Sequence, residues 1–74
     1  MANISGKRAL EKVLAHPSSM NSMMDEDIID AANEAVNTPV EKFFLEQITD
    51  ASVDAGKSAL AQLALLNRKN AKAA

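Results

Sequence analysis

The stretch Asn37–Glu41, NTPVE, constrains the fold most, because it combines several features of a helix start. Thr38 suits the N-cap position, Pro39 suits the first helical position and Glu41 completes a capping box. Apolar residues then recur at steps of three or four, close to the α-helical period, at Val40, Phe44, Ile48, Ala51, Ala55, Ala59, Leu63 and Leu66. This spacing predicts one long helix over about residues 39–69. The alternative is a break at Ala55–Gly56, with Gly56 ending one helix before another begins.

Two shorter helices are predicted before the long one. Ser5 suits the N-cap of a helix over about residues 6–16, and Pro17 ends it because the residue before a proline avoids the α region. A second helix, over about residues 23–36, begins with acidic residues that favour a helix N-terminus. Each of the two helices has an apolar stripe at helical spacing. The stripe of the first helix is Ala9, Leu10, Val13 and Leu14, and that of the second is Ile28, Ile29, Ala32, Ala35 and Val36. The sequence thus predicts an all-α helical hairpin or bundle, with a linker or turn at HPSSMNS.

The chain has 74 residues and no cysteine, which limits how its fold can be stabilised. We expect a single small helical domain over residues 1–74, with frayed ends at residues 1–4 and 70–74. A chain this short is marginal as a monomer. The absence of thiols excludes disulfides and thiolate metal sites, and His16 is the only histidine. We expect no cofactor or metal, and a fold completed by oligomerisation or by a partner.

The stretch Ala51–Ser58, ASVDAGKS, fits the loosest form of a phosphate-binding loop. Such a loop follows a strand and opens a helix. Here the preceding residues are predicted to be helical, and Asp50 and Asp54 would repel phosphate. We therefore interpret the stretch as a thin part of the long helix where another helix crosses closely, since small residues lie four apart. These residues are Ala51, Ala55 and Ala59 in one line, and Ser52 and Gly56 in the next.

Charge is distributed unevenly along the chain. Residues 1–16 carry three bases and one acid, residues 25–54 carry nine acids and one lysine, and residues 57–74 carry four bases and no acid. One interpretation is that the charges match helix dipoles. The other is that acidic and basic segments pair between copies of the chain. The acidic run DEDIID does not predict a calcium site, because it lacks the glycine and the distal glutamate of a calcium loop.

The sequence favours neither an enzyme nor a nucleic-acid-binding protein. It shows no activated nucleophile or positioned base, and its acidic centre opposes DNA. If the chain were a helix–turn–helix protein, its last helix would contact DNA with only a few polar side chains: Lys57, Gln62, Asn67 and Arg68. Three methionines, Met20, Met23 and Met24, are either core filling or an adaptable contact surface.

We therefore predict a non-enzymatic helical self-association module, a structural subunit of a homo-oligomer or filament. In size, helical make-up and scarcity of aromatic residues, and at that level only, the chain resembles needle and pilin subunits of type III secretion. The alternative is a small adaptor or inhibitor, of phage or bacterial origin, that binds a larger protein through an amphipathic or acidic helix. The predicted interface residues are Phe44, Ile48, Ala55, Gly56, Leu63 and Leu66.

The N-terminus lacks the apolar run of a signal peptide, and no stretch is long enough to span a membrane. We expect synthesis in the cytoplasm, with leaderless export as an open alternative.

Overall fold

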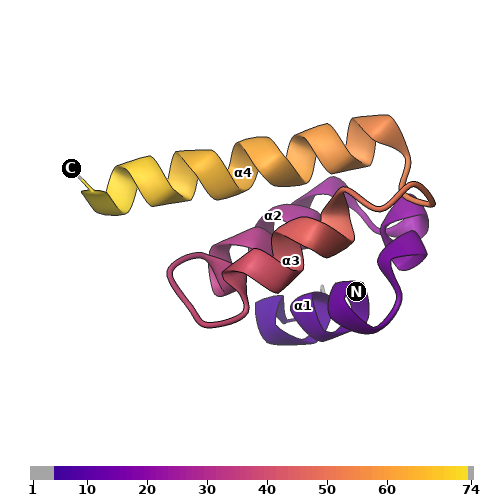
Figure 1. Cartoon of the computed structure of the whole chain (residues 1–74), viewed down its shortest axis with the longest axis horizontal. Coiled ribbons are helices and arrows are strands. Elements are labelled where there is room, and N and C mark those ends of the chain that lie inside the picture. Colours follow the sequence, from indigo (N-terminus) through magenta and orange to yellow (C-terminus); the bar gives the residue numbers. More distant parts are fainter. Residues whose placement is uncertain (1–4, 74) are drawn as a thin grey trace.

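The computed structural model describes residues 5–73 and shows only helices within that range (Figure 1). The elements are α1 (Gly6–Ala15), the 3₁₀ helix η1 (Pro17–Ser22), α2 (Asp25–Ala35), α3 (Glu41–Ile48) and α4 (Ala55–Ala73). The predicted all-α class, with a long helix at the C-terminal end, is confirmed. Residues 1–4 and 74, predicted to be frayed, lie outside the described range.

The two short helices occur close to their predicted positions. The Ser5 side chain accepts a hydrogen bond from the backbone N–H of Arg8 (3.3 Å) and so caps α1, as the sequence predicts. Pro17 begins η1, so the predicted linker is a short helix of its own. In α2 the face toward the core is Ile28, Ala31, Ala32 and Ala35, all fully buried, whereas Ile29 is 36% exposed.

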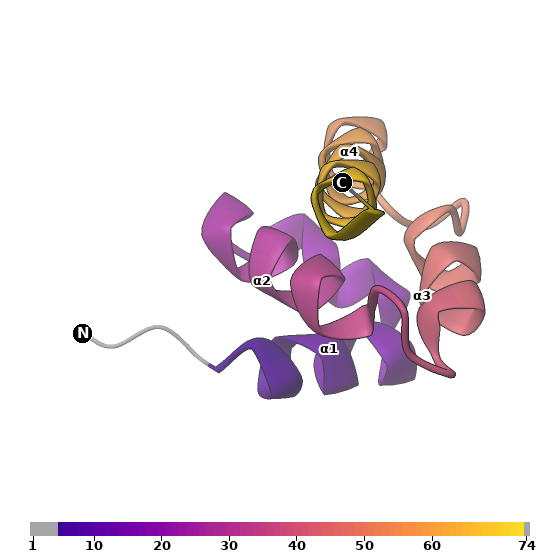
Figure 2. The same cartoon turned by 90° about the vertical axis from the view of Figure 1, so that its left-hand side faces the viewer.

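The helices form three layers (Figure 2), with α1 on one side, α2 and α3 in the middle and α4 on the other side. The side chains between the layers form one core, in which Phe44 is the largest fully buried residue. Small residues let α1 approach α2 closely: a Cβ atom added at Gly6 would lie 2.8 Å from Glu34 Cγ and 3.2 Å from the Asp30 carbonyl oxygen. A close approach between helices of the same chain therefore occurs at Gly6.

The predicted continuous helix over 39–69 is wrong, because residues 49–54 separate α3 from α4. Its start is also later than predicted, at Glu41, because Thr38 and Pro39 form a turn in which the Thr38 hydroxyl donates to the Ala35 carbonyl (2.6 Å). At the other end, α4 continues to Ala73 and includes residues 70–73, which we expected to be frayed.

The break has a physical cause in polar side chains that replace helical hydrogen bonds. The Asp50 carboxylate accepts bonds from the backbone N–H (2.8 Å) and hydroxyl (2.6 Å) of Ser52, which forms a local turn. The Asp54 carboxylate then accepts bonds from the N–H groups of Gly56 (2.9 Å) and Lys57 (3.3 Å), as an N-cap does. Apolar spacing continues across this segment, but the local polar bonds end one helix and start the next.

Asn21 fixes this loop to η1 across a long separation in sequence. Its side-chain amide donates to the Ser52 carbonyl oxygen (2.9 Å) and accepts from the Asp54 N–H (2.7 Å). Val53, between these two residues, is 7% exposed and belongs to the core. The asparagine thus holds the loop where Val53 can be buried and α4 can fold back over α2 and α3.

We expect Asn21→Ala to lower the free energy of unfolding by about 1–2 kcal/mol, because two hydrogen bonds of about 0.5–1.5 kcal/mol each are lost. Urea unfolding followed by circular dichroism measures this change. Ser18→Ala, at an exposed position in the same 3₁₀ helix, is the matched control and should change stability by no more than about 0.5 kcal/mol. Equal stability of the two variants would contradict the role of Asn21.

Candidate interaction surface

The outward side of α4 carries the most exposed large apolar side chains of this helix. Leu63 is 55% exposed and Leu66 is 54% exposed. Ala59 and Asn70 are also exposed, and the four residues follow one another at steps of 4, 3 and 4, which places them on one helix face. We call these four residues the α4 seam. The opposite side of α4, where Ala61 is fully buried and Leu65 is 7% exposed, packs on the core.

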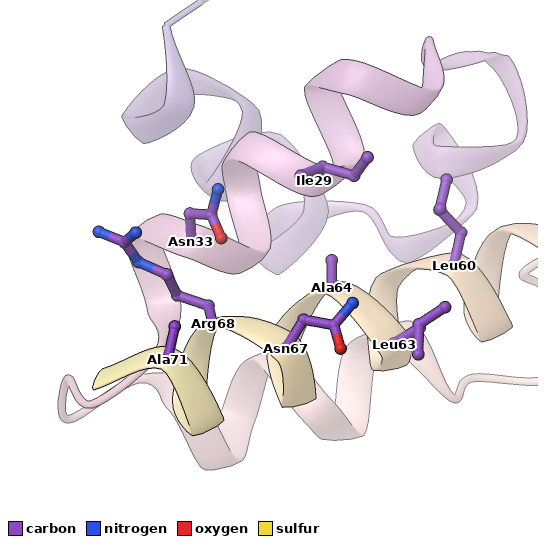
Figure 3. Close-up of a pocket in the computed structure, with 8 residues that line it drawn as sticks. All are labelled: Ile29, Asn33, Leu60, Leu63, Ala64, Asn67, Arg68 and Ala71. Carbon is purple, nitrogen blue, oxygen red and sulfur yellow. The ribbon is translucent and has the colours of Figure 1, made fainter. Parts of the chain in front are cut away.

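Two grooves flank α4, and Leu63 lines both. The first lies between α2 and α4, has a volume of about 450 Å³ and is shown in Figure 3. It is lined by Ile29, Asn33, Leu60, Leu63, Ala64, Asn67, Arg68 and Ala71. Ile29 reaches in from α2, with Leu60, Leu63 and Ala64 coming from α4 (Figure 3), so one end is apolar, whereas Asn33, Asn67 and Arg68 make the other end polar.

The second groove lies between α3 and α4 and has a volume of about 550 Å³. It is lined by Glu41, Leu45, Ala59, Gln62, Leu63, Leu65, Leu66 and Lys69. Leu45 of α3 is 42% exposed, which extends the apolar surface of the seam onto the neighbouring helix. The seam is therefore a ridge with a partly apolar groove on each side, and a second helix can pack on such a surface by inserting its side chains into the grooves.

The six predicted interface residues fall into three separate places. Phe44 and Ile48 are fully buried in the core of their own chain. Ala55 and Gly56 lie exposed at the start of α4, and only Leu63 and Leu66 form an exposed apolar pair. Gly56 has open space around it apart from the Asp54 carboxylate, 3.1 Å from an added Cβ.

The phosphate-loop-like stretch forms a loop followed by the first turn of α4, not the thin part of a helix that we predicted. The N–H groups that would face a phosphate are bonded to Asp54 instead. The Lys57 side chain is also occupied, since it donates to the Met23 carbonyl (2.9 Å) and pairs with Asp25 (3.1 Å). The structure thus fills the anion position with a carboxylate of the same chain.

Glu41, which lines the second groove, connects the start of α3 to the loop before it and to α4. One carboxylate oxygen accepts from the backbone N–H of Asn37 (2.7 Å) and the other pairs with Lys69 of α4 (2.6 Å). Asn37 has a φ of 61°, in the left-handed region, which asparagine tolerates better than most residues. The hydrogen bond from Lys69, followed by that from Asn37, lowers the pKa of Glu41 below its usual 4.5.

This lowered pKa predicts a loss of stability in acid. The contribution of Glu41 is complete above pH 4.5 and disappears as the pH falls through the lower pKa of the folded state. The pKa of Asp50, lowered from 3.8 by the hydroxyl and N–H of Ser52, acts in the same direction. We expect Glu41→Gln to be less stable than the native chain at neutral pH, and the two to converge as the pH falls below the lowered pKa of Glu41. Urea midpoints measured across this range test the prediction, and a constant difference would contradict it.

The ion pairs of the described residues connect the acidic and basic segments within one chain. Lys57 pairs with Asp25, and Lys69 pairs with Glu41. Asp27, in the first turn of α2, is 8% exposed, and one of its carboxylate oxygens has no hydrogen-bond partner among the described residues. Its position at a helix N-terminus offsets part of the cost of burying it.

The methionines and the histidine have structural positions. Met20 is fully buried and Met23 is 7% exposed, which favours core filling for these two, whereas Met24 is 58% exposed. His16 is exposed in the extended residue between α1 and η1. Within the part of the chain that the structure describes, no three ligand-type side chains gather as a metal site. In the same part, no helix has the length and hydropathy needed to cross a membrane.

Comparison with protein-family models, with characterised proteins and with solved structures finds no match for this chain.

Sequence reasoning identified the two exposed leucines but not their surroundings. It missed Asn21, Gly6 and Leu45. The role of Asn21 could not be predicted from the residues next to it in the sequence, because the loop to which it bonds lies more than thirty residues later. Leu45 is an apolar residue next to Phe44 in the sequence, and whether its side chain is exposed depends on where α4 lies.

Proposed function

We propose that the chain is a non-enzymatic helical module that works by self-association, as a structural subunit of a homo-oligomer. The observation that supports this most is the exposure of Leu63 and Leu66 at the centre of the α4 seam, each more than half accessible. Their neighbours on the inward side of α4 complete the core, whereas these two leucines lie outside it. Exposed contiguous apolar surface on a small protein marks interaction sites.

The shape of the chain favours a closed oligomer over a filament. Its principal extents are 33 × 30 × 21 Å, and the chain turns back between α3 and α4, so the molecule is not an extended rod. A two-fold dimer covers the α4 seam of both copies and leaves neither copy of the seam open.

The binding of a larger protein is the second candidate, and it has its own supporting observation. Met24, 58% exposed, stands beside Asp25, whose side chain is 71% exposed. An apolar side chain at the edge of an acidic helix start suits a basic partner surface.

Mass in solution separates the two candidates. Light scattering of the purified full chain over a hundredfold concentration range should show a mass that rises from one chain toward two, and not further. A mass of one chain at every concentration would contradict self-association and favour the second candidate. A mass that keeps rising with concentration beyond two chains would favour a filament.

A further inference from the structure

On the basis of the self-association proposed above, we propose that two copies pair through the α4 seam in a two-fold, antiparallel arrangement. In this arrangement Leu63 of one copy lies against the partner's Leu66. The two-fold axis passes between residues 64 and 65, which also places Ala59 opposite the partner's Asn70.

The spacing of the seam supports helix pairing. Steps of 4, 3 and 4 are those of the a and d positions of a two-helix seam, and all four residues are exposed. The antiparallel register puts the small Ala59 opposite the longer Asn70 at both ends of the contact. Asn70 then lies at the edge of the contact, where water completes its hydrogen bonds.

Charge decides the direction of the partner helix. α4 has three bases near its end, Arg68, Lys69 and Lys72, and no acid over its whole length, whereas the base near its start, Lys57, pairs with Asp25 of the same chain. A parallel pair would place the basic ends of both copies side by side and would repel. An antiparallel pair separates them by the length of the helix and also opposes the two helix dipoles.

The antiparallel direction brings a complementary charge to each basic end. α2 and α4 run in the same direction, since Lys57 contacts Asp25 and Leu60 shares a groove with Ile29. The partner's Arg68 therefore lies at the level of Ala61, beside Ile29 and about one helical turn beyond Glu26 of α2. Glu26 is exposed and lies three residues before Ile29, on the stripe that faces the first groove, within reach of a long arginine side chain. Neither of the two ion pairs among the described residues includes Arg68 or Glu26, so these two side chains can pair with each other between copies.

The contact is small. A helix of 19 residues is about 28 Å long, so the buried area falls at the low end of specific interfaces. We expect a dissociation constant on the order of micromolar, which places the monomer–dimer transition within reach of dilution experiments.

Disulfide trapping tests the arrangement cleanly, because the native chain has no cysteine. Three samples of the full chain are oxidised gently: Ala59→Cys alone, Asn70→Cys alone, and an equal mixture of the two. Both positions are exposed, so neither change disturbs the core, and circular dichroism confirms that the helices remain. We expect covalent dimers in the mixture and few in either single sample.

Each other result overturns the arrangement in a distinguishable way. Efficient dimers of Ala59→Cys alone would mean parallel pairing. No covalent dimer in any sample, while light scattering still shows two chains, would mean that self-association uses another surface. A chain that stays monomeric at every concentration would overturn self-association itself and would leave the seam for a different protein.

A pair of substitutions measures the contribution of the leucines. We expect Leu66→Ala to raise the dissociation constant of the dimer at least tenfold. Phe43→Ala, which removes a side chain that is 45% exposed on α3 outside the seam, should change it less than threefold. Equal effects of the two substitutions would contradict pairing through α4.

Discussion

Phe44→Ala should lower the free energy of unfolding by about 3–5 kcal/mol, the usual cost of removing a fully buried aromatic side chain. Phe44 is fully buried and is the largest such side chain of the core. A domain of this length has a total stability of roughly 4–11 kcal/mol, so the variant should lose a large part of its stability. Urea unfolding, followed by far-ultraviolet circular dichroism, measures the change.

The neighbouring phenylalanine supplies the matched control for this experiment. Phe43 is 45% exposed, and Phe43→Ala should cost about 1 kcal/mol or less. The two variants have the same composition and differ only in the side of α3 from which the ring is removed. Equal losses would show that α3 does not turn Phe44 toward the core.

Ala9→Leu should destabilise the chain by about 1–3 kcal/mol, the usual cost of overfilling a packed core. Ala9 is fully buried one turn after Gly6, at which α1 comes close to the backbone of α2. Ala31, Ala32 and Ala35 on α2 are also fully buried. This layer is made of small side chains, and a leucine fits only if the helices move apart. Thermal and urea unfolding report the loss.

Ala15→Leu is the control for this substitution, since Ala15 is exposed in the same helix and leucine has a high helix propensity. Its stability should stay within about 0.5 kcal/mol of the native chain. If Ala9→Leu were as stable as Ala15→Leu, the close packing of α1 on α2 would be wrong.

Features that depend on neighbouring residues were predictable from the sequence. The cap at Ser5, the stop at Pro17 and the acidic start of α2 all act within a few residues, and the structure has each of them. The apolar stripe of α4 likewise identified Leu63 and Leu66 as residues of one face, because helical spacing alone decides that.

The break between α3 and α4 was harder to predict, because periodicity and local polar bonding disagree there. The stripe continues through Ala51 and Ala55, which favours a single helix. Asp50 and Asp54 favour a turn and a cap, and the bonds from Asn21 make that choice stable. The last contribution comes from a residue far away in the chain, so no short window of sequence contains it.

The same break explains why the predicted interface was only partly accessible. In one long helix, Phe44, Ile48, Leu63 and Leu66 would share a face. Once the chain turns back at residues 49–54, the first two belong to the middle layer and become core, while the last two face outward. The fold thus divides one predicted stripe between the interior and the surface.

Nuclear magnetic resonance of the isotope-labelled native chain during dilution tests the central claim most directly, because it reports which residues change environment when copies separate. We expect concentration-dependent amide shifts at Ala59, Leu63, Leu66 and Asn70, with smaller shifts near Glu26, and almost none in α1. Spectra that do not change with concentration, or shifts confined to surfaces away from α4, would contradict self-association through the seam.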